Sequence, residues 1–290
     1  MKKRTLIYLL LIVLCGAVFF GYRAFSQMND DHTIPTIKID ESITDFSIRE
    51  DRTQLLQGVS AADETDGDVT ASLLVEQVIL TDSSGTAKVT YAAFDTSGNV
   101  AKASRTIRYT DYVSPRFVLE QPLVFQQNKN FDILNIVQAQ DLLDGNISHR
   151  IRATAINSTS ITNPGVHQVE FRVTNSLGDT SCLVFPVEVL PYGSHQASLT
   201  LTDYLIYIRV GDSFKAESFL DRFTLGQESV SLNGKLPKGY TLHLNGNVNP
   251  AVPGVYPLGY TVTYKAASER DPEVYTEYEA YSKLIVVVEG

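Results

Sequence analysis

The chain has 290 residues, of which 43% are hydrophobic and 20% charged, and its formal net charge is −9. Its 15 Tyr and 13 Phe supply enough apolar surface for folded domains and exclude a disordered acidic tail. The acidic balance excludes nucleic acid as a partner, because phosphates need a basic surface. The 2 cysteines are too few for a disulfide framework or a thiolate zinc site.

The amino terminus carries the pattern of a membrane segment. Residues 5–22 contain no charged side chain and are mostly Leu, Ile, Val and Phe, with basic residues at 2–4 before them and Arg23 after them. A helix that crosses a bilayer needs about 17–25 such residues, so this run is near the lower limit. Since cytoplasmic flanks are enriched in Lys and Arg, we expect residues 1–4 inside the cell and everything after Arg23 outside.

Two other interpretations of this segment stay open. Residues 24–26 (AFS) suit a signal-peptidase site, but the apolar run exceeds the usual ~7–15 residues of a cleaved signal. A lipoprotein signal around Cys15 is disfavoured because Leu14 stands where a small residue is expected. All three interpretations place the rest of the chain outside the cytoplasm. We favour the first, in which residues 1–25 form an anchor that is not cleaved.

Beyond this segment the chain repeats itself at a spacing of about 80 residues. Three landmarks recur in the same order: residues 31–37 (DHTIPTI) as 111–117 (DYVSPRF), 63–70 (DETDGDVT) as 141–148 (DLLDGNIS), and 85–98 (GTAKVTYAAFDTSG) as 165–178 (GVHQVEFRVTNSLG). Small changes in spacing are what loop insertions produce between copies of one fold, so we expect two similar domains.

A third and less regular copy follows. Residues 233–236 (NGKL) and 253–255 (PGV) match 144–147 and 164–166 of the second copy in order, and Tyr260 matches Phe171. Residues 266–272 replace a much shorter turn, which predicts a longer last hairpin. The chain therefore divides into an anchor, 1–25, and three domains, 26–111, 112–191 and 192–290.

The local pattern in all three copies is that of β-strands. Residues 88–93, 168–173 and 259–264 alternate between apolar and polar side chains, which is typical of strands with one buried face. Asp-Gly, Asn-Gly and Ser-Gly pairs mark turns between the runs. Repeats of ~80–90 residues built from many short strands predict an all-β chain of tandem immunoglobulin-like sandwiches after one transmembrane helix.

The landmarks of the first copy, taken together, resemble the bacterial immunoglobulin-like repeat of surface proteins, which is also found in pesticidal crystal proteins. The resemblance is good over residues 31–111, moderate over 112–191 and weak over 198–290. It implies an extracellular sandwich module, often in tandem, with no chemistry common to the family. Position 87, an alanine here, is usually aromatic in that family.

A cluster of acids is the main candidate site. Asp63, Asp66 and Asp68 lie within six residues in the first copy, and Asp95 follows in a hairpin turn. Closely spaced carboxylates in loops suit Ca²⁺, which takes six to eight oxygen ligands. The alternative is turn chemistry, because Asp side chains accept hydrogen bonds from their own backbone two residues on. The second and third copies replace Asp68 by Asn146 and Lys235, so any calcium site is expected in the first copy alone.

Other candidate residues have simpler interpretations. The tyrosines of the third copy suggest either a binding face or core residues: we expect Tyr256, Tyr260 and Tyr264 in the core, and at least one of Tyr275, Tyr278 and Tyr281 exposed. Cys182 is expected to be a small buried residue in a strand. Metal-protease, nucleophile-elbow and phosphate-loop motifs are missing from the sequence, which predicts a protein that is not an enzyme and needs no cofactor.

These patterns together predict a bacterial protein anchored in the cell membrane by its amino-terminal helix, with tandem domains outside the cell. Its expected role is adhesion or binding to a protein or glycan ligand, or acting as a spacer that displays the last domain. The alternatives are a glycan- or cell-wall-binding accessory protein and a structural subunit of an envelope complex. Domains joined by short linkers such as 111–115 are expected to stack end to end.

Overall fold

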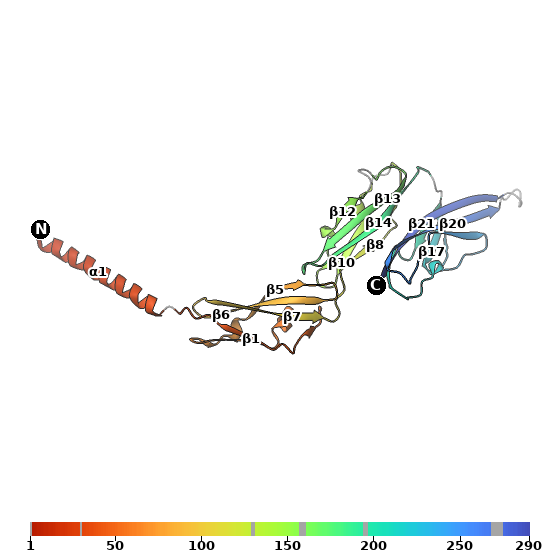
Figure 1. The fold of residues 1–290 in the computed structure, drawn as a ribbon. Coiled ribbons are helices and arrows are strands. Elements are labelled where there is room, and N and C mark those ends of the chain that lie inside the picture. Colours follow the sequence, from red (N-terminus) through yellow and green to blue (C-terminus); the bar gives the residue numbers. More distant parts are fainter. Residues whose placement is uncertain (1, 30, 129–130, 157–160, 194–196, 268–274) are drawn as a thin grey trace. The chain divides into compact units, whose positions relative to one another are not determined.

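The computed structural model describes residues 2–29, 31–128, 131–156, 161–193, 197–267 and 275–290. The chain divides into two compact units, Met1–Tyr112 and Val113–Gly290. Both contain mainly β-strands in several sheets, which confirms the all-β part of the predicted fold (Figure 1). Below, repeats one, two and three denote the predicted domains 26–111, 112–191 and 192–290, whose boundaries stay predictions.

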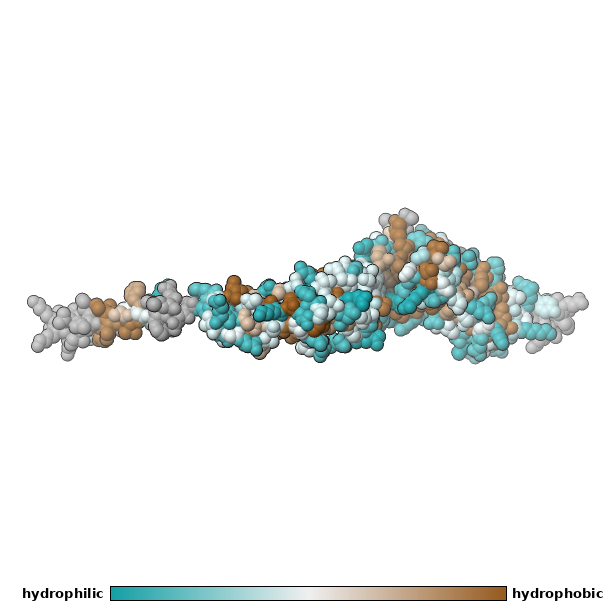
Figure 2. Space-filling view, turned by 60° about the horizontal axis from the view of Figure 1, so that its bottom comes forward, coloured by the Kyte–Doolittle hydropathy of each residue, from teal (hydrophilic) through white to brown (hydrophobic). Residues whose placement is uncertain are grey.

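The amino-terminal helix is α1, Lys2–Asn29. Within it, the side chains of residues 8 and 11–23 are described, and their large apolar members are exposed: Leu11 and Ile12, for example, are 50% and 71% exposed. Figure 2 shows some of these apolar residues in brown on the face of the helix in view. Among the described residues, no helix meets both the length and the apolarity that a membrane crossing requires. The predicted helix is present, and its insertion into a membrane stays a prediction.

Repeat one is a sandwich of two sheets, with strand orders β1-β3-β4 and β2-β7-β6-β5. Neighbouring strands pair antiparallel, except that β2 pairs parallel to β7. The elements are β1 Thr36–Ile39, β2 Asp45–Phe46, the 3₁₀ helix η1 Arg52–Leu56, β3 Val59–Asp63, β4 Gly67–Asp68, the 3₁₀ helix η2 Thr70–Ser72, β5 Leu74–Leu80, β6 Thr86–Phe94 and β7 Val100–Tyr109.

Repeat two has the same layout, with sheets β11-β10-β8 and β12-β13-β14-β9. Its parallel pair is β9 and β14, in the same place as β2 and β7 of repeat one. The elements are β8 Arg116–Leu119, β9 Val124–Gln126, α2 Ile133–Ile136, β10 Val137–Asp141, β11 Gly145–Asn146, the 3₁₀ helix η3 Ser148–Arg150, β12 Arg152–Ala155, β13 Gly165–Thr174 and β14 Thr180–Leu190.

Repeat three also follows this layout, with sheets β15-β17-β18 and β16-β21-β20-β19 and with β16 parallel to β21. The elements are β15 Ala197–Leu201, β16 Leu205–Arg209, the 3₁₀ helix η4 Ala216–Phe219, β17 Leu220–Leu225, β18 Glu228–Ser231, β19 Tyr240–Asn245, β20 Gly254–Ala267 and β21 Tyr275–Glu289. The strands β20 and β21 make the predicted long hairpin, whose turn lies outside the described residues.

One aromatic residue anchors the core of each sandwich at the matching position. Tyr91, Phe171 and Tyr260 lie in the middle of the alternating strands β6, β13 and β20, and each is 0% exposed. The Tyr91 hydroxyl donates to the Leu55 carbonyl at 2.9 Å, and the Tyr260 hydroxyl donates to the Ala216 carbonyl at 3.0 Å. Both hydroxyls thus fix a 3₁₀ helix against the core, because a buried phenol needs a hydrogen-bond partner.

Repeats two and three lie side by side within one unit. Glu289, near the end of β21, forms an ion pair with Arg116 at the start of repeat two. Lys283, earlier in β21, forms an ion pair with Glu188 near the end of repeat two. The carboxyl terminus therefore returns to the beginning of repeat two (Figure 1). The expected end-to-end stacking is wrong for these two repeats.

Candidate functional site

Four aspartates converge at one end of repeat one. Asp31 precedes β1, Asp63 ends β3, Asp66 lies in the turn from β3 to β4, and Asp95 follows β6. Each offers a carboxylate oxygen, and these four oxygens all lie within 4.8 Å of one another. Asp63 and Asp95 are buried, at 8% and 9% exposure. Segments far apart in the sequence thus place acids in one partly buried group.

Turn chemistry explains why two of these acids hold their positions. Asp63 Oδ1 accepts the backbone N–H groups of Thr65 at 2.8 Å and Asp66 at 3.1 Å. Asp95 Oδ1 accepts the backbone N–H of Asn99 at 2.7 Å, and Asp95 Oδ2 accepts the Asn99 side-chain amide at 2.7 Å. An Asp side chain that accepts from the backbone a few residues on stabilises a tight turn, so the turn interpretation holds for both.

Further hydrogen bonds tie the three segments together. Asp66 accepts the backbone N–H and the hydroxyl of Thr96, each at 2.8 Å, which joins the β3–β4 turn to the β6–β7 turn. The Asn99 side-chain amide donates to the Asp31 carbonyl at 3.0 Å. The Thr33 hydroxyl lies 3.2 Å from Asp63 Oδ2. The four carboxylates are therefore held together by neutral donors.

Ion pairs do not balance the charge of this cluster. Within the described parts of the chain, none of the four carboxylates takes part in one. Asp31 Oδ2 is buried and, among the described residues, has no hydrogen-bond partner. Hydrogen bonds from the Thr33 hydroxyl and backbone hold the pKa of Asp31 below its ordinary value, so this carboxylate is charged at neutral pH.

Such a group can bind a hard divalent cation. Two unit charges 4 Å apart repel by about 1 kcal/mol even in bulk water, and by more near a protein surface. A divalent cation removes that repulsion, and Ca²⁺ accepts carboxylate, carbonyl and hydroxyl oxygens at about 2.3–2.6 Å in flexible geometries. The donors present are all oxygens, which suits Ca²⁺ rather than a softer metal.

The structure brings together three of the four predicted ligands and adds one. Asp63, Asp66 and Asp95 are in the cluster, whereas Asp68 is exposed and turns back to accept the backbone N–H of Thr70 at 2.9 Å. The Thr70 hydroxyl, together with this backbone contact, lowers the pKa of Asp68. Asp31 was missed, although its recurrence in the repeated opening motif gave a signal that its position matters.

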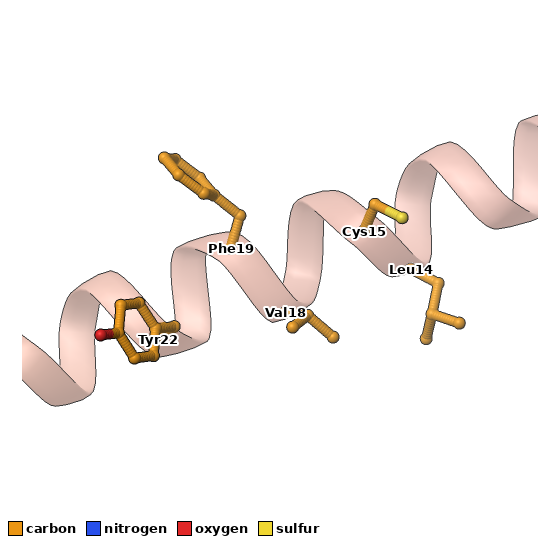
Figure 3. Close-up of a pocket in the computed structure, with 5 residues that line it drawn as sticks. All are labelled: Leu14, Cys15, Val18, Phe19 and Tyr22. Carbon is orange, nitrogen blue, oxygen red and sulfur yellow. The ribbon is translucent and has the colours of Figure 1, made fainter.

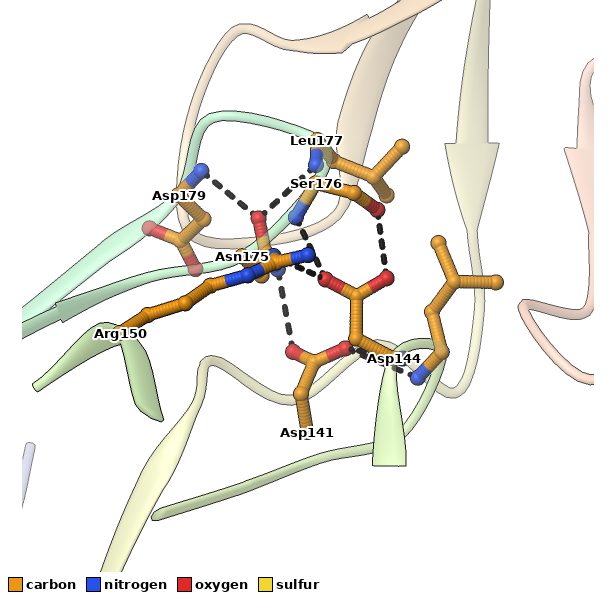
Figure 4. Close-up of polar contacts among 8 residues, drawn as sticks. Asp141, Asp144, Arg150, Asn175, Ser176, Leu177 and Asp179 are labelled. Atoms are coloured by element: carbon orange, nitrogen blue, oxygen red, sulfur yellow. Dashed lines mark hydrogen bonds and ion pairs between the residues drawn. The ribbon is translucent and has the colours of Figure 1, made fainter. Parts of the chain in front are cut away.

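Repeat two builds the same loops with a different charge balance (Figure 4). Asp141 and Asp144 correspond to Asp63 and Asp66, and Asn175 replaces Asp95. The Asn175 amide donates to Asp141 Oδ2 at 3.0 Å, and Asn175 Oδ1 accepts the backbone N–H groups of Leu177 and Asp179, both at 3.0 Å. In repeat two, Asp141 therefore accepts a hydrogen bond from an amide, whereas its counterpart in repeat one, Asp63, faces the carboxylate of Asp95.

An arginine adds one positive charge to this network. Arg150 Nη1 lies 2.7 Å from Asp144 Oδ2, and Ser176 donates its N–H and hydroxyl to Asp144 at 2.7 and 2.6 Å (Figure 4). Burial opposes ionisation of Asp144, but the Ser176 hydrogen bonds and the Arg150 charge together hold its pKa below the ordinary value. The residue of repeat one that corresponds to Arg150 is Ser72. Repeat two therefore has a positively charged side chain where repeat one has a hydroxyl.

The same end of repeat three is aromatic. Tyr264 stands where repeats one and two have Asp95 and Asn175. Its ring stacks on that of Tyr240 with centroids 4.5 Å apart, and Phe223 packs edge-on against Tyr240 at 5.3 Å. The matching position therefore lies in a cluster of carboxylates in repeat one, in a polar network with an amide and an arginine in repeat two, and in an aromatic cluster in repeat three.

The remaining sequence candidates divide between core and surface. Tyr260 is fully buried, Tyr256 and Tyr264 are half-buried, and Tyr275 is 57% exposed, so at least one of the last three tyrosines is exposed as predicted. The prediction that Cys182 is buried is wrong, because its side chain lies on the outer face of β14 near Arg172. On α1, five side chains line a shallow pocket along one face of the helix: Leu14, Cys15, Val18, Phe19 and Tyr22 (Figure 3).

Comparisons with known proteins give two curated relatives. The chain is 27% identical over 183 residues to an uncharacterized 81.3 kDa protein of Acholeplasma phage L2, and the match covers 61% of this chain and 23% of the relative. It is 23% identical over 268 residues to the pesticidal crystal protein Cry22Aa of Bacillus thuringiensis, covering 87% of this chain and 35% of the relative. The chain thus spans only about a quarter to a third of these relatives.

Similar solved structures are distant. One holds the M60 catalytic domain with two CBM51 domains of ZmpB from Clostridium perfringens, at 11% identity and a TM-score of 0.24, covering 89% of this chain and 43% of that chain. Another is the extracellular domain of protocadherin GammaB4, at 10% identity and a TM-score of 0.19, covering 89% of this chain and 50% of that chain.

A family comparison matches the first sandwich. Residues 36–108 match the family described as bacterial surface protein, Ig-like domain. This range runs from the start of β1 almost to the end of β7, so it takes in both sheets of repeat one. The resemblance predicted from the sequence landmarks is therefore confirmed, and residues 36–108 are similar to the Ig-like domain of bacterial surface proteins.

Proposed function

We propose that the chain is a non-catalytic bacterial surface protein whose Ig-like sandwiches are displayed outside the cell and bind a protein or glycan ligand. The family match of residues 36–108 carries this proposal. The uncharged run of residues 5–22 between basic flanks, with apolar side chains exposed on all sides of α1, supports attachment through the amino-terminal helix.

Protease treatment of intact cells tests this topology. A tag placed after Gly290 is expected to be lost when protease is added outside the cell, while the chain stays in the membrane fraction after an alkaline wash. A control chain in which a cleavable signal peptide replaces residues 1–25 is expected in the medium. Protection of the tag in intact cells would contradict surface display.

The class of ligand is separated by two further experiments. Glycan arrays and cell-wall pull-downs with the full chain distinguish a glycan- or wall-binding accessory protein from a protein adhesin. Replacing residues 1–25 by an unrelated anchor tests the third alternative, a subunit that contacts an envelope complex through its helix. Retained function after that exchange would refute a helix contact.

A second function is favoured by the carboxylate cluster of repeat one: binding of Ca²⁺ by Asp31, Asp63, Asp66 and Asp95. The observation that favours it is the contrast with repeat two, where an amide and an arginine supply the positive side of the same network. Isothermal titration of the full chain with calcium is expected to give one site per chain. Asp63→Asn is expected to abolish that site, and two or more sites of equal affinity would contradict an assignment to repeat one alone.

A further inference from the structure

The last strand of repeat three is buried on both faces. In β21, the seven consecutive residues 282–288 are all buried. The matching last strand of repeat one, β7, instead alternates between buried and exposed side chains, as a strand with one covered face does. A continuous apolar run such as 284–288 needs a second cover, because otherwise every other side chain faces water.

The two faces of β21 belong to two different cores. Leu284, Val286 and Val288 pack in the hydrophobic cluster of repeat three with Tyr260 and Val262. Ile285 and Val287, the residues between them, pack in the cluster of repeat two with Phe117, Phe171 and Phe185. One strand therefore contributes alternate side chains to two sandwiches.

The neighbouring strand β16 has the same double role. Ile206 and Ile208 pack against the cluster of repeat three, and Leu205 and Tyr207 pack against that of repeat two. The Tyr207 hydroxyl accepts the backbone N–H of Phe117 at 2.9 Å, so its polar end is satisfied inside repeat two. The apolar contact between the two repeats therefore includes a hydrogen bond from repeat two to repeat three.

Two ion pairs lie beside this apolar contact between repeats two and three. Lys283 is only 6% exposed and forms an ion pair with Glu188, which also accepts the Tyr281 hydroxyl at 2.8 Å. On the other side, the Arg116 guanidinium lies over the Tyr207 ring, 4.8 Å from its centroid, and pairs with Glu289. Separating the repeats would therefore expose apolar side chains of β21 to water and break the ion pair of Lys283 at the same time.

We propose that repeats two and three form one obligate head, residues 113–290, which folds and unfolds as a single unit. The inference goes beyond the proposed surface display: the displayed element would be the two-sandwich head, and repeat three would not act as a separable terminal module. A head of this kind carries a pulling force from a bound ligand without opening between its two sandwiches.

Stretching the full chain between handles at its two ends, in detergent micelles, tests the proposal. Unfolding releases about 3.5 Å per residue. The head of Val113–Gly290 is then expected to open in one event of about 600 Å, and repeat one in a separate event of about 300 Å. Three separate events of about 300 Å each would overturn the proposal.

Two matched core variants keep the test sharp. Val187 lies in the core of repeat two and Val262 in the core of repeat three, and both are 0% exposed. Val187→Ala and Val262→Ala are each expected to lower the force of the single event in which the whole head opens. If each variant lowers the force of a different, shorter event, the two repeats are independent.

Discussion

Repeats one and two close the same end of the sandwich with hydrogen-bonded networks that differ in charge. Both close the end of a sandwich with an aspartate-rich turn that is tied to a hairpin turn by one carboxylate, Asp66 to Thr96 in one and Asp144 to Ser176 in the other. In repeat two the Asn175 amide and Arg150 contact the acids, whereas in repeat one Asp95 and Asp31 join the cluster. Asp111, which matches Asp31 in the sequence, instead accepts hydrogen bonds from Ser47 and Ile48. One backbone frame thus holds either a network in which an amide and an arginine contact the acids, or a cluster of four acids that we propose binds a cation.

The difference continues in the cores. Arg105 is 3% exposed in β7 of repeat one, where it donates to the Leu55 and Gln57 carbonyls at 2.9 and 3.1 Å. Its guanidinium also lies over the rings of Phe46 and Tyr91. The corresponding residue of repeat two is Phe185. Repeat one therefore buries a cation in its core, whereas repeat two fills the same position with an aromatic ring.

Arg105→Met is expected to destabilise the protein more than any other single change that probes this contrast. The variant keeps the apolar volume but leaves the buried Leu55 carbonyl and the partly buried Gln57 carbonyl each with one donor fewer, which costs about 2–4 kcal/mol. Chemical denaturation of the full chain checks this, with Phe185→Met in repeat two as the matched control. A change below about 0.5 kcal/mol for Arg105→Met would show that water replaces the guanidinium.

Asn175→Asp converts the network of repeat two toward that of repeat one. Asn175 and Asp141 are 5% and 8% exposed, so the new carboxylate faces a buried acid and a donor is lost. We expect residues 113–290 to lose about 2–3 kcal/mol of stability without calcium. Chemical denaturation with and without millimolar calcium measures this change in the free energy of unfolding. An unchanged free energy of unfolding would mean that the hydrogen bond from the Asn175 amide does not stabilise the fold.

Arg150→Met tests the cation of repeat two with a smaller effect. The pair is partly exposed, so we expect a loss of about 1 kcal/mol at neutral pH. Because the folded pKa of Asp144 is lowered, its contribution is present above the unfolded pKa of about 4 and is lost as pH falls through the folded pKa. In the Arg150→Met variant, the free energy of unfolding should therefore decrease less as the pH falls. An unchanged pH profile of stability would contradict the role given to Arg150.

Asp68→Asn should have the smallest effect, below about 0.5 kcal/mol. Asp68 is exposed, stands apart from the cluster and already has Asn146 as its counterpart in repeat two. Calcium binding by this variant, measured by titration, is expected to equal that of the unchanged chain. A loss of binding would return Asp68 to the set of ligands.

Sequence patterns predicted the sandwiches well because each core strand shows its buried face locally, as Val89 and Tyr91 do in β6. They also predicted three of the four clustered acids, since the Asp-Gly turn and the hairpin turn recur in order. The sequence did not indicate Asp31 as a ligand, because only the tertiary fold brings the segment before β1 to the two turns. The exposure of Cys182 depends on which face of β14 is covered.

The arrangement of repeats two and three was harder to foresee. The apolar run from Leu284 to Val288 does not alternate with polar residues, which is typical of a strand with two covered faces. What covers the second face is a neighbouring sandwich whose sequence carries no local mark of that contact. The side-by-side packing of repeats two and three could therefore not be predicted from the sequence pattern of β21 alone.

Thermal unfolding of the full chain in a calcium titration tests the central comparison most directly. Extracellular calcium modules bind at about 10⁻⁴–10⁻³ M, so calcium at about 10 mM is about 10 to 100 times the Kd and stabilises the folded state by about 1.4–2.7 kcal/mol. We predict that calcium at about 10 mM raises the Tm of the repeat-one transition by roughly 10 °C and leaves that of residues 113–290 unchanged. In Asp95→Asn, which copies Asn175, the shift should vanish. No shift in the unchanged chain, or the same shift in Asp95→Asn, would contradict the account.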